Sequence, residues 1–109
     1  MSEKLNYYPY EVKAAVNEIG LQLRIARKRR RMPQSELATK AGISEKTLRR
    51  LELGDAGVAF GCVLRVLWAL GLLANATALA NPDTDRHGKI LELARLPQRI
   101  RESIPNNDF

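Results

Sequence analysis

The stretch AGISEKTLRRLELGD (residues 41–55) decides the fold that we predict for this chain of 109 residues. Gly42 stands where helices often end in a left-handed residue, and Ser44 is a suitable N-cap for a helix that follows directly. Leu48 and Leu51 are three residues apart, so they share one side of that helix and predict its buried face. The charged side chains of the stretch are then left for the other side.

A second short helix is predicted immediately before this one, in PQSELATKA (residues 33–41). Pro33 is tolerated in the first turn of a helix. Two short helices joined by a turn of about three residues that contains glycine have the dimensions of a helix-turn-helix. The side chains expected to be buried on the first of these helices are Leu37, Ala38 and Ala41.

The remaining segments also have helical patterns, since branched and aromatic residues never alternate with polar ones over the length of a strand. In residues 10–30, apolar residues recur at three- and four-residue spacing. Gly20 weakens the middle of this segment, so an extra N-terminal helix is either separate from the next one or bends into it. We therefore predict an all-α chain, with further helices in residues 60–70, 72–80 and 86–96.

The segment of residues 60–70 has Arg65 as its only polar member. A surface helix would have a polar face, whereas a helix that is apolar all round must be covered on every side. A domain of this size can hardly enclose a whole helix, so we expect part of it to meet a second copy of the chain. The alternative is a fully central helix with no role in dimerisation. The expected dimer interface consists of Leu64, Trp68 and Leu72.

The positive charge of the chain is concentrated in one place. The formal net charge is +6, and residues 1–31 hold eight Lys or Arg against three Asp or Glu. Most of these cations form the block RIARKRRR (residues 24–31). Such a block attracts a polyanion, and nucleic acid is the commonest one in a cytoplasm. The alternative is a solvated helix end, where cations suit the negative pole of the helix dipole.

Composition disfavours several classes of protein. The N-terminal residues are polar where a secretory signal would need an apolar region, and no run approaches the roughly 18 apolar residues of a membrane span. We therefore expect a cytoplasmic protein without a membrane partner. Cys62 is the only cysteine and His87 the only histidine, so we predict no enzyme activity, no catalytic residue, no metal site and no cofactor.

The segment IGLQLRIARKRRRMPQSELATKAGISEKTLRRLELG (residues 19–54) resembles the Xre/Cro group of helix-turn-helix DNA-binding domains, which includes the lambdoid phage repressors. The resemblance extends to about Leu73 and rests on QSELA, AGIS, the apolar–x–x–apolar–Glu–x–Gly ending and an apolar fourth helix that ends in LGL. It implies a lambda-repressor-like domain of five helices at residues 19–80. Residues 1–18 would then be an N-terminal helical extension, and residues 81–109 a C-terminal one.

The resemblance also implies roles for individual residues. The residues implied to face base edges are Glu45, Lys46, Arg49 and Arg50. Gln34, Ser44 and Thr47 are implied to lie near the DNA backbone, and the basic block adds Arg29, Arg30 and Arg31 there. Arg27 and Glu52 match a pair that forms a structural ion pair in the family, so we assign both to the scaffold.

Three positions in this segment leave questions that the residues alone do not answer. Glu45 can accept a hydrogen bond from cytosine, pair with a neighbouring cation or favour the helix start. Pro33 replaces the usual Ser or Thr cap, which removes a side-chain acceptor. Arg31 stands where glycine is common, which predicts a strained or altered turn.

The later segments GDAGVAFGCVLRVLWALGLL and NPDTDRHGKILELARLPQRIR are similar to HipB-type antitoxins, which are encoded beside HipA-like kinases. This resemblance implies a prokaryotic or phage-encoded homodimer that binds palindromic operators in double-stranded DNA and represses its own promoter. It also implies a complex with a HipA-like kinase or its companion subunit. The alternatives are a stand-alone Xre-type or phage-like repressor and a protein-interaction adaptor.

Overall fold

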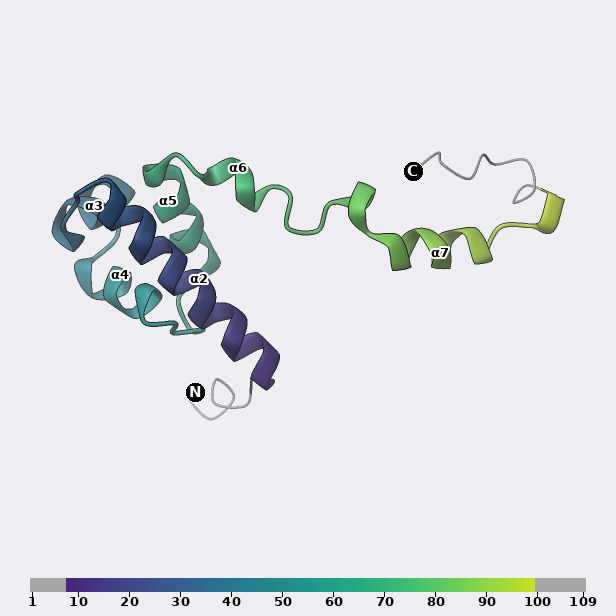
Figure 1. The fold of residues 1–109 in the computed structure, drawn as a ribbon, viewed down its shortest axis with the longest axis horizontal. Coiled ribbons are helices and arrows are strands. Elements are labelled where there is room, and N and C mark those ends of the chain that lie inside the picture. Colours follow the sequence, from purple (N-terminus) through teal and green to yellow (C-terminus); the bar gives the residue numbers. More distant parts are fainter. Residues whose placement is uncertain (1–7, 100–109) are drawn as a thin grey trace. The chain divides into compact units, whose positions relative to one another are not determined.

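The structure, a computed structural model, describes residues 8–99. These residues form helices and turns without any strand, which confirms the predicted all-α class (Figure 1). The chain divides into two units, Met1–Ala76 and Thr77–Phe109. The helices of the first unit are α2 (Tyr10–Arg29), α3 (Gln34–Ala41), α4 (Glu45–Glu52), α5 (Phe60–Leu70) and α6 (Leu73–Ala76).

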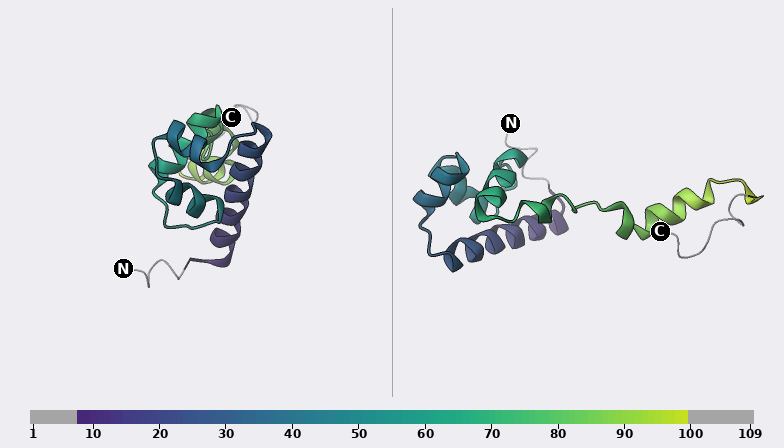
Figure 2. Two further views of the ribbon diagram at one scale, coloured as in Figure 1. Left: turned by 90° about the vertical axis from the view of Figure 1, so that its left-hand side faces the viewer. Right: turned by 90° about the horizontal axis from the view of Figure 1, so that it is seen from above.

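Helix α2 is continuous and runs along one side of the first unit (Figures 1 and 2). It contacts α4 and α5, while α3 contacts the same two helices. The N-terminal helical segment and the first helix of the domain are therefore one helix. Gly20 does not interrupt it, and this glycine is buried where α2 meets the end of α4.

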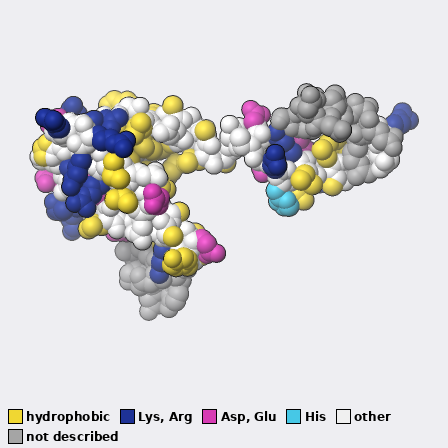
Figure 3. Space-filling view, in the orientation of Figure 1, with side chains coloured by type: hydrophobic (Ala, Val, Ile, Leu, Met, Phe, Trp, Pro, Cys, Tyr) yellow, Lys and Arg dark blue, Asp and Glu magenta, His cyan; other side chains and the backbone are white. Residues whose placement is uncertain are grey.

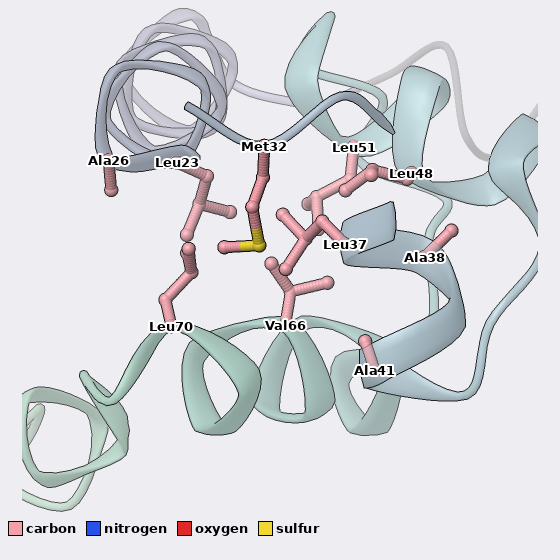
Figure 4. Packing of buried hydrophobic residues seen from close by; sticks show 10 residues of the cluster. All are labelled: Leu23, Ala26, Met32, Leu37, Ala38, Ala41, Leu48, Leu51, Val66 and Leu70. Atoms are coloured by element: carbon pink, nitrogen blue, oxygen red, sulfur yellow. The ribbon is translucent and has the colours of Figure 1, made fainter. Parts of the chain in front are cut away.

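The core of the first unit lies between these helices (Figure 4). Each helix contributes side chains from one face, and the turn between α2 and α3 adds one more. Burial of these apolar side chains stabilises the unit, because each Leu, Val or Met side chain removed from water contributes about 1.5–3 kcal/mol. The buried apolar residues are Leu23, Ala26, Met32, Leu37, Ala38, Ala41, Leu48, Leu51, Val66 and Leu70.

Helix α5 is only partly enclosed. Val66 and Leu70 are buried in the core, whereas Phe60 and Trp68 are each 61% exposed on the outward side. Leu64 is half-buried and lies between them at four-residue spacing. The described residues therefore do not make α5 the fully central helix of the alternative interpretation.

The second unit contains a short 3₁₀ helix, η1 (Pro82–Thr84), and α7 (Arg86–Ala94). The Asp85 side chain caps α7 by accepting a hydrogen bond from the backbone N–H of Gly88, at 3.0 Å. Two helices are shorter than expected. Helix α7 ends at Ala94, and α6 spans four residues of the predicted 72–80 because none of its residues is buried to stabilise a longer helix. No helix in residues 8–99 has the length and apolar character needed to cross a membrane.

Candidate nucleic-acid interface

The turn between α3 and α4 has the backbone that its sequence predicts. Gly42 is left-handed, with φ of 72°, and Ser44 is the N-cap of α4. The Ser44 Oγ accepts a hydrogen bond from the backbone N–H of Thr47 at 3.0 Å and donates one to Thr47 Oγ1 at 2.8 Å. The two side chains therefore fix the start of α4, and both lie on its N-terminal turn.

Helix α4 buries one side and exposes the other. Leu48 and Leu51 are buried in the core, while Glu45, Lys46 and Arg49 are exposed. Glu45 and Arg49 form an ion pair one helical turn apart, with 3.7 Å between Oε2 and Nη1. An exposed pair of this kind contributes little to stability, so it leaves both side chains able to rearrange. Lys46 makes no hydrogen bond or ion pair with any described residue.

Arg50 differs from the other cations of α4 because it is bonded to the loop that follows. Its Nε donates to Asp55 Oδ2 at 2.7 Å, and Asp55 Oδ1 accepts from the backbone N–H of Gly57 at 2.7 Å. These hydrogen bonds to Arg50 and Gly57 lower the pKa of Asp55 below its ordinary value. The sequence analysis missed Asp55, although an acidic residue five positions after an arginine, just beyond Gly54, was a usable signal.

Arg27 and Glu52 form a buried bidentate ion pair between α2 and α4. Arg27 Nε lies 2.7 Å from Glu52 Oε2, and Arg27 Nη2 lies 2.9 Å from Glu52 Oε1. Arg27 Nη1 also donates to the backbone carbonyl of Met32 at 2.9 Å, and the Gln34 amide donates to Glu52 Oε1 at 3.0 Å. The hydrogen bond to the Glu52 carboxylate favours the charged guanidinium and raises the pKa of Arg27 above its ordinary value. The pair thus holds the end of α2, the following turn and α4 together.

A hollow of about 460 Å³ opens beside this ion pair. Arg24 of α2 and Arg49 of α4 line it together with the exposed Leu53, and the half-buried Gln34 lies at the same hollow. Arg24 is a cation that the sequence analysis did not single out as a contact residue. Only the packing of α2 against α4 brings Arg24 and Arg49 together, so no local pattern could have indicated the hollow.

The basic block ends at the turn after α2. Arg29 is exposed, and Arg30 Nη1 donates to the carbonyl of Ala26 in its own helix at 2.8 Å. Arg31 is exposed and has a φ of 55°, the left-handed conformation expected of the glycine that is common at this position. In Figure 3, Lys and Arg side chains gather over the region of the first unit where the end of α2, α3 and α4 lie.

No group of three or more His, Cys, Asp and Glu side chains in residues 8–99 is placed to hold a metal ion. Cys62 is half-buried on α5, where a thiol behaves as a small apolar residue.

A model of the family described as a helix-turn-helix domain matches residues 18–80, which include α3, the Gly42 turn, α4 and α5. No curated protein and no solved structure matches the chain. The family match covers more than half of the chain and contains every residue of the exposed α4 face. The chain therefore belongs to the DNA-binding family of helix-turn-helix domains.

Proposed function

We propose that this protein is a sequence-specific transcriptional regulator that binds palindromic operators as a homodimer. The observation that carries the proposal is the exposed face of α4, which is anchored by Leu48 and Leu51 and presents Lys46 and Arg49 outward. The major groove of B-DNA admits one α-helix, whose N-terminal residues contact base edges. Helix α4 is the element of the first unit that suits this role.

The base contacts that we propose follow from the donors and acceptors on this face. Arg50 can donate to guanine O6 and N7 through two N–H groups, and Lys46 can donate to the same atoms as a point charge. Arg49 and Glu45 can separate from each other on DNA, because their ion pair is exposed and long. Glu45 would then accept from a cytosine amino group, and Arg49 would take a base edge or a phosphate.

Contacts with the DNA backbone are proposed for the surroundings of α4. Ser44 and Thr47 lie at its N-terminal turn, and Gln34 keeps one amide N–H beyond the bond to Glu52. Arg24 and Arg49 offer two guanidinium groups at one hollow, which suits a phosphate. The basic turn adds long-range attraction that does not depend on sequence, through Arg29, Arg30 and Arg31.

The outward face of α5 supports dimerisation through a second copy of this chain. Phe60, Leu64 and Trp68 follow each other at four-residue spacing, and Leu72 continues the apolar surface while packing partly against the core. Large exposed apolar patches of this kind mark protein interaction sites. A two-fold dimer formed through α5 would present two copies of α4, one for each half-site of a palindromic operator.

An antitoxin role is the finer part of the proposal. It is supported by the resemblance of the α5 region and of the second unit to HipB-type antitoxins. The second unit also exposes apolar side chains of α7, since Ile90 and Leu91 are both exposed. We propose that a HipA-like kinase, or its companion subunit, binds this protein in addition to DNA. Examination of the neighbouring open reading frame, followed by co-purification of its product with this chain, tests the partner directly.

Fluorescence anisotropy with the DNA upstream of the protein's own gene tests DNA recognition. A protein that contacts about six to ten phosphates loses roughly three to five decades of affinity between 50 and 200 mM salt. Lys46→Ala should weaken binding to the operator more than binding to random duplex. Arg95→Ala removes one cation from the second unit and serves as the matched control, with operator affinity close to that of the wild type.

The same measurements distinguish the alternatives. A protein-interaction adaptor would bind DNA weakly and would hold its partner almost equally well at both salt concentrations. A stand-alone repressor would bind its operator with full salt dependence but would form no complex with a kinase. Equal affinity of the wild type for operator and random duplex would contradict sequence-specific recognition.

A further inference from the structure

We infer that Asp55 is a positioning residue for base recognition, because it holds Arg50 of α4 through Nε and leaves both Nη groups as a fork for guanine. This inference rests on the proposed function, in which α4 enters the major groove. It deepens that function by naming a residue outside α4 that sets the preference for one base. It concerns the loop after α4, to which the resemblance assigns no role.

The geometry commits both oxygens of the Asp55 carboxylate. Oδ2 accepts from Arg50 Nε at 2.7 Å, and Oδ1 accepts from the Gly57 backbone N–H at 2.7 Å. The bond to Gly57 fixes the carboxylate to the loop backbone, so the carboxylate in turn fixes the guanidinium. Both side chains remain accessible, with 43% of Arg50 and 40% of Asp55 exposed. The pair therefore lies at the surface, within reach of a ligand.

The hydrogen bond to Asp55 uses only one of the donors of Arg50. A guanidinium carries five N–H donors, of which four belong to Nη1 and Nη2. These four find no acceptor among the described residues. Since the guanidinium is planar, a bond at Nε also fixes the plane in which both Nη groups lie. Guanine O6 and N7 accept two parallel N–H groups of this kind.

The fixed orientation favours a base over a phosphate for two reasons. A long side chain loses rotamer freedom when it becomes ordered on a ligand, and Arg50 has lost part of that freedom already. The Asp55 carboxylate is also an anion, so it repels a phosphate that approaches Arg50, whereas guanine carries no net charge. Asp55 thus lowers the entropy cost of ordering the Arg50 side chain on guanine, and it makes contact between Arg50 and a DNA phosphate less favourable.

A purely structural role for Asp55 makes a different prediction. In that case the carboxylate only holds the loop through Gly57, and its removal would lower binding to every duplex in the same proportion. A positioning role instead lowers binding to the preferred duplex alone. The ratio of the affinities for preferred and random DNA separates the two roles, because a loss of folded protein affects both affinities equally.

The experiment uses the full chain and duplexes selected by the wild type from a pool with a randomised centre. Asp55→Ala should lower affinity for the selected duplex by roughly tenfold, while affinity for random duplex stays equal or rises. The preference for guanine at one base pair of each half-site should fall in parallel. Asp55→Asn, which keeps an acceptor for Nε, should retain more of that preference than Asp55→Ala does.

Arg50 variants complete the comparison. Arg50→Ala should lose the same base preference, and the double variant should be no worse than Arg50→Ala, because Asp55 acts through Arg50. Arg50→Lys keeps a charge beside Asp55 but has no fork, so it should also lose the preference. The melting temperature of each variant shows whether it is folded, and Asp55→Asn replaces Asp55→Ala if the latter is not.

The outcomes separate the inference from the proposed function. If the wild type selects no preferred duplex, the proposed function fails and the inference fails with it. If the wild type selects a duplex and Arg50→Ala loses a base preference that both Asp55 variants keep, only the inference fails. Equal losses on selected and random duplex in the Asp55 variants would also overturn it, since they indicate a structural role.

Discussion

Arg27 and Lys46 illustrate two different uses of positive charge in the first unit. Arg27 is 7% exposed and donates to Glu52 and to the backbone of Met32, whereas Lys46 has no partner among the described residues. A buried charge needs its partner, because desolvation without compensation costs several kcal/mol. An exposed cation without a partner contributes little to folding and is available to a ligand. Arg50 lies between these two cases.

Removal of one member of the buried Arg27–Glu52 pair should lower the free energy of unfolding more than removal of both members does. Glu52→Leu leaves Arg27 as an uncompensated buried charge and should lower the free energy of unfolding by about 3–5 kcal/mol. The double variant Arg27→Met/Glu52→Leu should recover most of this loss, since no charge remains to be desolvated. Urea denaturation of the wild type, both single variants and the double variant measures the coupling. Simple addition of the two single losses would contradict the assignment of a coupled pair.

Substitutions of Arg31 should distinguish the effect of backbone strain on stability from the effect of its charge on DNA binding. Its left-handed φ of 55° is unfavourable for a residue with a Cβ by about 1–2 kcal/mol. Arg31→Gly relieves that strain but gains chain entropy in the unfolded state, so it should raise the free energy of unfolding by up to about 1 kcal/mol. Binding to all duplexes should weaken alike, with a salt slope lower by about 1 if Arg31 contacts phosphate.

Arg31→Ala provides the matched control for this prediction. It removes the same charge and keeps a Cβ in the left-handed conformation, so its DNA affinity should match that of Arg31→Gly while its unfolding midpoint stays lower. Urea denaturation and anisotropy on a random duplex measure the two effects separately. Equal stability of the two variants would contradict the prediction, because the strain relieved by glycine would then be no larger than the entropy that glycine adds to the unfolded state.

At the scale of elements, the contact between α2 and the end of α4 depends on a glycine. A Cβ placed on Gly20 would lie 2.6 Å from the backbone oxygen of Leu51 and 2.8 Å from that of Glu52. These are backbone atoms, so they cannot move without shifting α4. Gly20 therefore sets how closely the two helices approach, and with it the position of the Arg27–Glu52 pair.

Gly20→Ala should destabilise the protein even though alanine is the better helix former. In an exposed helix interior this change stabilises by about 1 kcal/mol, but overpacking at a tight contact costs about 1–3 kcal/mol. Gly61 in α5 is the control, because a Cβ there would meet nothing within 4 Å. Gly61→Ala should therefore be neutral or stabilising in thermal unfolding. A stabilising Gly20→Ala would mean that α2 and α4 separate readily.

The sequence predicted the parts of the helix-turn-helix that depend on residues close to one another along the chain. The Gly42 turn, the Ser44 cap and the buried face of α4 each involve contacts within a few positions, so local chemistry indicates them. Gly20 was interpreted as a weak point in a helix, because its low helix propensity is visible in the sequence and its contact with Leu51 is not. The Arg24–Arg49 hollow was missed for the same reason.

The proposed dimer is a property of the whole molecule and depends on the outward face of α5. Trp68→Lys places a charge at a position that is 61% exposed in one copy and would be buried between two. It should dissociate the dimer without unfolding the domain, because the core face of α5 is unchanged. Leu79→Lys, at a 70% exposed apolar residue of the second unit, is the control. Sedimentation equilibrium measures the dissociation constants, and an unchanged value for Trp68→Lys would exclude α5 as the interface.

The spacing of half-sites tests whether the two copies act as one rigid pair. The two α4 helices of a two-fold dimer should contact half-sites about 10–10.5 base pairs apart, or a multiple of this distance. Insertion of about five base pairs between the half-sites turns one of them to the opposite face of the duplex. Wild-type affinity, measured by anisotropy, should then fall towards that for a single half-site, because only one α4 can enter its groove. Trp68→Lys should bind both duplexes alike, since a monomer does not sense the spacing. If the wild type were equally indifferent to the insertion, the two copies would be binding independently, and the α5 face would not be what joins them on DNA.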